Sequence, residues 1–308
     1  MQNPLDISHE ISSALNRNEP VVALESSLIA HGLPSKVNVE TALAMEQCIR
    51  DAGAIPATIG IIEGKVRVGL IKEEIEKLGE GNAAKIASRD IPYAVAKKLD
   101  GGTTVSATAR IASTAGITVM ATGGIGGVHR GFAETLDVSA DLWELAHNAI
   151  VVVCSGAKAI LDIPATAEWL ESHSVSVYGY ETEELPSFYS RSSGITIPRV
   201  DGIDDFADII KLSRGVMGVR SAAILAVPIP KSAEIDAFKY VEQALQEAYN
   251  DGIKGKDLTP YLLGKIGELT KGKSIDANVA LLKNNAAVAA RVAIAICEET
   301  RRRMGFTV

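Results

Sequence analysis

Short runs of apolar and β-branched residues alternate along the chain with stretches in which apolar residues recur every three or four positions. The short runs predict strands, and the longer spacing predicts one buried face of an α-helix. Strands are expected over Val21–Leu24, Thr58–Ile62, Val66–Val68, Ile117–Ala121, Ile150–Val153, Ser176–Tyr178 and Ala222–Val227. Helices are expected over Val39–Ile49, Ala107–Ala115, Phe238–Ala248 and Val279–Ile296. This alternation predicts an α/β fold built from layers.

No feature of the sequence divides the chain of 308 residues into separate units. It contains no internal repeat, low-complexity segment or clear linker, so a single α/β domain over residues 1–308 is expected. Hydrophobic residues make up 47% of the chain and charged residues 22%, which is typical of soluble globular proteins.

The charge balance restricts the classes of ligand. A net charge of −7 argues against a nucleic-acid-binding protein, because such proteins usually carry a basic face. A small anionic ligand remains compatible with this charge, since a few local basic residues are enough to bind it.

Three further features indicate a cytoplasmic protein. Cys48, Cys154 and Cys297 lie far apart and form no CxxC pair, which is typical of buried thiols in a reducing compartment. The longest purely apolar run, Ala149–Cys154, is far shorter than the ~20 residues of a membrane-spanning helix. The first residues also lack the basic and apolar regions of a signal peptide.

A glycine-rich segment, ATGGIGGVHRG at residues 121–131, follows one of the expected strands. Glycines let a ligand approach backbone N–H groups closely. The spacing is not a dinucleotide-binding fingerprint, because His129 stands where the third glycine is required. The segment is either a tight turn or an anion site, and His129 and Arg130 favour a phosphorylated ligand.

A second stretch of small residues, Gly101–Ser106, precedes the helix expected at Ala107. Its hydroxyls and N–H groups predict either a phosphate site at a helix start or a simple N-cap.

Three carboxylates are candidates for chemistry. Asp137 and Asp141 are spaced to share one helix face, where they would either hold Mg²⁺ or Mn²⁺ or cap the helix. Glu25 ends the expected strand Val21–Leu24 and precedes two serines. It is either a general acid/base or an exposed residue at a strand end.

Lys158 is the candidate nucleophile. It follows the apolar strand Ile150–Val153 and the small turn Ser155-Gly-Ala157, so its amine is expected to be partly desolvated. Desolvation favours the neutral amine, which can attack carbon. The alternative is a lysine that extends its ammonium to water from an apolar stem.

Several ordered segments together resemble one known family, the pseudouridine-5′-phosphate glycosidases, also called indigoidine synthase A-like proteins. The resemblance extends from Pro20 to about Ala293. The segments that carry it are PVVALES at 20–26, HGLP at 31–34, PATIG at 56–60, SRDIP at 88–92, TTV at 103–105, the glycine-rich segment, DVSAD at 137–141, CSGAK at 154–158, ILD at 160–162 and NN at 284–285.

The resemblance implies a role for each matching residue. Lys158 corresponds to the lysine that forms a Schiff base with ribose C1′, and Glu25 to the proton donor and acceptor. Asp137 corresponds to the ligand of a divalent ion, usually manganese. The implied substrate contacts are Lys85 (through the phosphate), Thr122 and His129 of the glycine-rich segment, Val105, Ser139, Ala140 and Asp141, and either Asn284 or Asn285 for uracil.

The family also implies an α/β/α sandwich around a mixed sheet, a homotrimer and reversible cleavage of a C–C glycosidic bond to uracil and ribose 5-phosphate. A lysine bonded to C1′ suits this reaction because its nitrogen lone pair can expel the uracil carbon and leave an iminium at C1′. Two other functions fit part of the pattern: a different lysine-dependent sugar-phosphate lyase or aldolase, and a non-catalytic nucleotide-binding protein. The pairing of Glu25 with Lys158 favours the enzyme over the binding protein.

Overall fold

The computed structural model describes residues 5–32, 35–253 and 258–303 of the chain. Its centre is one sheet of eleven strands with the order β1-β4-β3-β2-β7-β8-β11-β9-β10, and β6 joins β3 and β5 off this path. The strands are β1 Leu5–Ile7, β2 Val21–Leu24, β3 Ile55–Ile62, β4 Lys65–Val68, β5 Ala84–Ile86, β6 Gly101–Thr103, β7 Val119–Ala121, β8 Val151–Cys154, β9 Ser176–Tyr180, β10 Arg199–Val200 and β11 Ala223–Ala226.

The sheet is mixed. β3 pairs antiparallel with β4 and β6, whereas β2, β7, β8, β11 and β9 run parallel to one another. Strands β2, β7, β8 and β11 are buried along their whole length, which explains why their sequences are continuous apolar runs.

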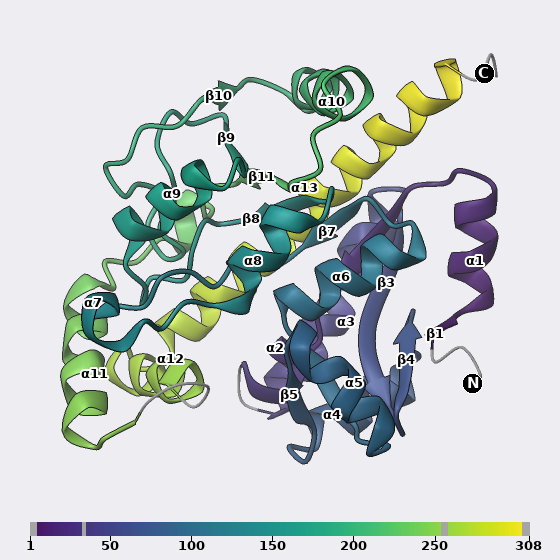
Figure 1. The fold of residues 1–308 in the computed structure, drawn as a ribbon. Helices are drawn as coiled ribbons and strands as arrows, with labels where there is room; N and C mark the ends of the chain where they lie inside the picture. The colour runs from purple at the N-terminus through teal and green to yellow at the C-terminus, as the bar shows by residue number, and fades with distance from the viewer. Residues whose placement is uncertain (1–4, 33–34, 254–257, 304–308) are drawn as a thin grey trace.

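Helices cover both faces of the sheet (Figure 1). The long helix α13 packs with α3 and lies against β2, β7 and β8, while the α6–α8 pair lies in front of the sheet in the view of Figure 1. The helices are α1 His9–Asn16, α2 Ser27–His31, α3 Ser35–Asp51, α4 Lys72–Gly79, α5 Ile91–Ala96, α6 Val105–Ala115, α7 Phe132–Thr135, α8 Ala140–His147, α9 Ile163–Ser172, α10 Ile203–Lys211, α11 Phe238–Asn250, α12 Leu258–Leu269 and α13 Lys273–Arg303, with short 3₁₀ or π turns η1 Ser88–Asp90, η2 Leu212–Val216 and η3 Lys231–Ala233. This arrangement confirms the expected three-layer α/β/α sandwich around a mixed sheet.

All seven strands expected from the sequence are present, and the four expected helices lie within α3, α6, α11 and α13. The strands that the pattern missed are β1, β5, β6 and β10, which have only two or three residues each. The small-residue stretch expected before the helix at Ala107 forms strand β6 up to Thr103, and α6 begins at Val105. A Cβ on Gly102 would lie 2.6 Å from the carbonyl oxygen of Ser26, so glycine lets β6 approach the loop that follows β2.

One large cluster of buried hydrophobic residues extends from Ile11 to Ala293, and a smaller one joins α2, α3 and α4. The single domain over residues 1–308 stays a prediction. The segment Lys273–Glu298 of α13 is long and apolar enough to cross a membrane by length and composition, but 50% of it is buried inside the protein. Core helices of soluble proteins have the same property.

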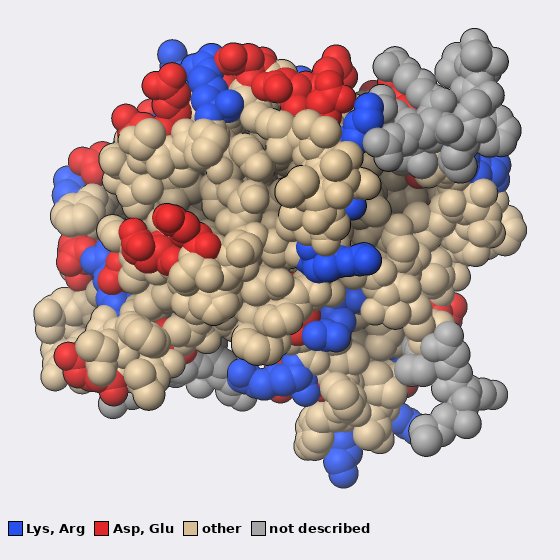
Figure 2. Space-filling model, turned by 45° about the horizontal axis from the view of Figure 1, so that its top comes forward, with Lys and Arg blue, Asp and Glu red and all other residues tan. Residues whose placement is uncertain are grey.

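The surface charge agrees with the acidic composition. Figure 2 shows acidic side chains along the upper edge of one face, whereas basic side chains lie in small separate groups.

A carboxyl group between α3 and the sheet makes stability depend on pH. Glu46 accepts a hydrogen bond from the buried Thr58 hydroxyl, and burial raises the pKa of the Glu46 carboxyl above its usual value. A raised folded-state pKa favours folding at acid pH, and this contribution is lost as the pH rises through that pKa.

We therefore expect Glu46→Gln to melt at a higher temperature than the wild type at neutral pH, because glutamine keeps the bond to Thr58 without a buried charge. At about pH 4, near the usual carboxyl pKa, the two proteins should melt at closer temperatures. Thermal unfolding at both pH values measures this difference. A gain in melting temperature that is equal at both pH values would show that ionisation of Glu46 is not its cause.

Candidate active site

A cavity of about 600 Å³ opens at the carboxyl ends of three neighbouring parallel strands. Glu25 follows β2, Thr122 follows β7, and Lys158 lies in the loop after β8. Lys85 of β5 lines the same cavity from the side. The carboxyl edge of a parallel sheet is where α/β proteins usually bind ligands, and this volume suits a small molecule.

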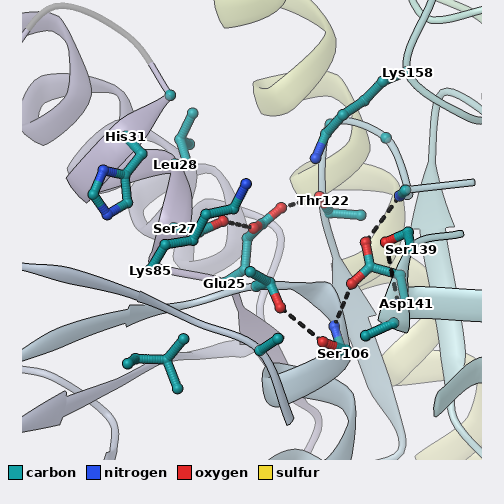
Figure 3. Close-up of a pocket in the computed structure, with 18 of the residues that line it drawn as sticks. Glu25, Ser27, Leu28, His31, Lys85, Ser106, Thr122, Ser139, Asp141 and Lys158 are labelled. Carbon is teal, nitrogen blue, oxygen red and sulfur yellow. Dashed lines mark hydrogen bonds between the residues drawn. The ribbon is translucent and has the colours of Figure 1, made fainter. Parts of the chain in front are cut away.

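Glu25 is fixed by hydroxyl groups on both of its oxygens. Ser27 donates to Oε2 and Thr122 donates to Oε1, as Figure 3 shows. Thr122 is fully buried, so its hydroxyl holds one face of the carboxylate in place. Together the two bonds hold the carboxylate in one orientation at the edge of the cavity.

Lys158 extends its amine into the cavity on the same side as Thr122 and Glu25 (Figure 3). Its backbone N–H donates to Ile125 at 3.1 Å, and Ile125 donates in turn to Gly156 at 3.0 Å, so the lysine loop runs beside the glycine-rich segment. Gly156 has a φ of +79°, and a Cβ there would meet the carbonyl oxygen of Pro186 at 2.0 Å. Only glycine therefore allows this turn before Lys158.

Asp141 joins two parts of the cavity wall. Its Oδ1 accepts the backbone N–H of Ser106 at 2.8 Å, and its Oδ2 accepts that of Gly126 at 2.9 Å. The residue is only 5% exposed. One carboxylate thus binds the first turn of α6 to the glycine-rich segment. The structure gives the side chain this bridging position, and the substrate contact implied for it stays a prediction.

The glycine-rich segment is less available as an anion cradle than the sequence indicated. The N–H of Gly126 is bonded to Asp141, that of Val128 to the Thr166 hydroxyl at 3.0 Å, and that of His129 to the Asp137 carbonyl at 3.0 Å. Because these amides are already satisfied inside the protein, the segment serves mainly to shape the wall.

His129 and Asp137 face the cavity from the two sides of one bridge. Burial lowers the pKa of the His129 imidazole, the positive charges of Lys158 and Lys85 lower it further, and Asp137 opposes them. The lowered pKa favours the neutral imidazole. His129 shares the cavity lining with Lys85, Lys158 and Asp137.

The residues around Asp137 would suit a divalent ion only in a hydrated form. Within the described residues, no group of three or more His, Cys, Asp or Glu side chains is placed to hold a metal. A single carboxylate can hold Mn²⁺ or Mg²⁺ when water and phosphate oxygens supply the other ligands. Asp137 lines the cavity and meets that limited requirement.

Three of the implied substrate contacts lie at the first turns of two helices. Ser139 and Ala140 line the cavity at the first turn of α8. Val105 is buried, so a contact from it would have to use the backbone N–H at the start of α6.

Neither Asn284 nor Asn285 is among the residues that line the cavity, so this geometry does not support the implied uracil contact for either. Asn285 is fully buried and donates to the Thr122 carbonyl at 2.9 Å. Asn278, two turns earlier on α13, does line the cavity. Its only signal in the sequence was a polar position within an apolar helical pattern.

Sequence reasoning also missed a wall formed by α2 and η1. His31, Leu28 and Arg89 line the cavity there. His31 and Arg89 belong to the segments HGLP and SRDIP, which carry part of the family resemblance but gave no role for either side chain. Burial and the charge of Lys85 lower the pKa of the His31 imidazole, and its Nε2 is buried without a partner in the described structure.

The fold and the cavity define the chain as an α/β enzyme with ionisable groups gathered at the carboxyl edge of a parallel sheet. Residues 10–295 match the family described as indigoidine synthase A like protein. The chain belongs to that family.

Its relatives are similar over nearly their whole length. A protein of Clostridium botulinum named pseudouridine-5′-phosphate glycosidase is 51% identical over 96% of this chain and 97% of its own. A protein of Hahella chejuensis with the same name is 50% identical over 94% and 97%. Among solved structures, the prealnumycin C-glycosynthase AlnA, in complex with ribulose 5-phosphate, matches with a TM-score of 0.89 and 39% identity over 97% of this chain and 99% of its own. An indigoidine synthase A-like protein from Thermotoga maritima matches with a TM-score of 0.89 and 35% identity over 96% and 98%.

Because Asp141 bonds two backbone N–H groups, its replacement should weaken the whole fold. In Asp141→Asn one of the two N–H groups faces an NH₂ group, so the free energy of unfolding should fall by about 1.5–3 kcal/mol, the range for hydrogen bonds to a charged group. Urea unfolding followed by circular dichroism measures this loss.

Asp137→Asn is the matched control, because the Asp137 side chain is half-buried and accepts no backbone hydrogen bond in the described structure. It should change the free energy of unfolding by less than about 0.5 kcal/mol. Equal losses in the two variants would remove the bridging role from Asp141.

Proposed function

We propose that this chain is a pseudouridine-5′-phosphate glycosidase that cleaves the C–C glycosidic bond through a Schiff base on Lys158. The observation that carries the proposal is that the Lys158 amine and the doubly hydrogen-bonded Glu25 carboxylate face one cavity. The names of the relatives from Clostridium botulinum and Hahella chejuensis support the substrate.

A C-glycoside requires both groups. The leaving atom is C5 of uracil, a carbon that must be protonated as its bond to C1′ breaks. A lysine nitrogen bonded to C1′ can supply the electron pair that expels it, which the usual two carboxylates across an oxocarbenium-like transition state do not supply. In the proposed reaction the Lys158 amine bonds to C1′ as the C1′–O4′ bond breaks and O4′ takes a proton. C5 is then protonated, the C1′–C5 bond breaks, and the nitrogen lone pair forms a C=N bond at C1′. Water hydrolyses this imine to ribose 5-phosphate and the free lysine.

The other residues of the cavity fit supporting roles. Glu25 would carry protons between the opened sugar and C5 of uracil. Lys85, with the first turns of α6 at Val105 and α8 at Ser139 and Ala140, would hold the phosphate, whose binding energy orients the reacting carbon. Thr122 would keep Glu25 in place, and Asn278 takes the place of Asn284 or Asn285 as the proposed contact for uracil.

We assign Asp137 as the protein ligand of a hydrated Mn²⁺ ion, which would neutralise part of the phosphate charge when bound. The assembly is proposed to be a homotrimer and the location the cytoplasm, as the family resemblance and the sequence imply.

The direct test is an assay for synthesis. The protein incubated with uracil, ribose 5-phosphate and Mn²⁺ should form pseudouridine 5′-phosphate, detected by chromatography and mass. The similarity to a C-glycosynthase that binds a pentulose phosphate supports this direction of the reaction. No product from uracil, together with cleavage of a sugar phosphate alone, would instead indicate an aldolase.

Substitution of the two reactive residues should separate their roles. Glu25→Ala should lower turnover by roughly 10²–10⁴-fold, the range for general acid–base catalysis, while still forming the imine with ribose 5-phosphate. Lys158→Ala should lose both turnover and imine formation but keep substrate binding through Lys85. Steady-state kinetics and borohydride trapping measure the two steps. Normal turnover in Glu25→Ala would make this carboxylate structural, and Asp141 and His129 would be the next candidates.

Metal removal should stop the reaction if Asp137 holds the ion. We expect chelated enzyme to lose activity and Mn²⁺ to restore it, whereas Asp137→Ala should lose activity that Mn²⁺ does not restore. Elemental analysis of the purified protein gives an independent measure of bound metal. Full activity in chelator with no metal bound would remove the ion from the mechanism.

A further inference from the structure

Asn285 lies between the loop that follows β7 at Thr122 and the loop that follows β8 at Ser155, and we call this meeting point the junction. The residue belongs to α13 and is fully buried. Its Nδ2 donates to the Thr122 carbonyl at 2.9 Å and to the Ser155 hydroxyl at 3.1 Å, and it lies 3.4 Å from the Gly123 carbonyl. Its Oδ1 lies 3.3 Å from the Ser155 hydroxyl, which can donate to it.

Each hydrogen-bond partner of Asn285 lies next to one of the two reactive groups in the structure or in the sequence. Thr122 is the residue whose hydroxyl donates to Glu25. Ser155 opens the turn that ends at Lys158, and its N–H donates to the Gly123 carbonyl at 2.9 Å. A single side chain is therefore bonded to the backbone that positions the carboxylate and to the turn that positions the amine.

We propose that Asn285 is a positioning residue that sets the distance between the Lys158 amine and the Glu25 carboxylate without touching the substrate. The inference rests on the proposed function, because it assigns these two groups as the reacting pair. It differs from the uracil contact that the sequence implied for this position.

The chemistry of the junction explains why an amide is needed there. Past the end of β7, the carbonyls of Thr122 and Gly123 point toward Asn285 of α13, and the Gly123 carbonyl also accepts the Ser155 N–H. A buried carbonyl without a partner is costly, and a side chain with two N–H groups and an acceptor can satisfy the Thr122 carbonyl and the Ser155 hydroxyl together. Because α13 packs along β7 and β8, its Asn285 is held against the loops that follow these two strands.

The test uses Asn285→Ala and Ser155→Ala, which remove the two sides of the junction. For each we would measure kcat and KM for pseudouridine 5′-phosphate cleavage, and the rate at which borohydride traps ribose 5-phosphate on the enzyme. Misplacement of the reacting groups should lower kcat by about 10²-fold in Asn285→Ala, with KM nearly unchanged and trapping slowed. The double variant should be little worse than Asn285→Ala, because both residues belong to one network.

Thr270→Val is the matched control. Thr270 is also buried on the α12–α13 side of the protein, and its hydroxyl donates to the Ile266 carbonyl at 2.7 Å, but it does not line the cavity. This variant should lower the melting temperature while kcat stays at the wild-type value. The comparison separates loss of a buried hydrogen bond from loss of positioning.

The following results would overturn the inference. A folded Asn285→Ala with wild-type kcat and trapping rate would show that the junction positions nothing. A raised KM with unchanged kcat would make Asn285 a substrate contact. Should Asn285→Ala not fold, Ser155→Ala decides, and a wild-type kcat there overturns the proposal. Wild-type enzyme that neither turns over pseudouridine 5′-phosphate nor traps ribose 5-phosphate would instead refute the proposed function itself.

Discussion

Three parallel strands, β2, β7 and β8, end side by side, and each leaves backbone groups beyond its last ladder bond. In the interior of a protein those groups must find partners, and the residues that supply them shape the cavity. Asp141 accepts from the amides of Ser106 and Gly126, and Asn285 donates to the carbonyl of Thr122. The same bonds that complete the fold thus fix the loops that carry Glu25 and Lys158.

This arrangement divides the polar residues into two sets. Asp141 and Asn285 are at most 5% exposed and form hydrogen bonds mainly with backbone groups. Glu25, Lys85, Lys158 and His129 are half-buried and face the cavity. The first set holds the loops in place, and the second set is available to a ligand. A polar residue close to the cavity can therefore have a structural role alone. Part of the glycine-rich segment belongs to the first set, since the amides of Gly126 and Val128 are bonded within the protein.

The parts of the structure that could be predicted are those that depend on local pattern. The sequence predicts strands β2, β7, β8 and β11 because strands buried on both faces are continuous apolar runs. It also predicts Glu25 and Lys158 as site residues because each follows such a run. Asn285 bonds a residue 163 positions away, and Asp141 bonds one 35 positions away, so no local spacing reveals either role. The sequence also contains no sign that the amides of Gly126 and Val128 are bonded to distant side chains, and the anion site expected at the glycine-rich segment stays a prediction. Strand β6 was missed because its close packing against Ser26 and Ile86 requires glycine, which a strand pattern does not predict.

The central claim is that Lys158 is the residue that becomes covalently bonded to the sugar. The most direct measurement is mass spectrometry of peptides from enzyme treated with ribose 5-phosphate and borohydride. The account predicts one reduced pentose phosphate adduct per chain, on the peptide that contains Lys158. An adduct on the peptide of Lys85, or no adduct in enzyme that forms pseudouridine 5′-phosphate, would contradict it.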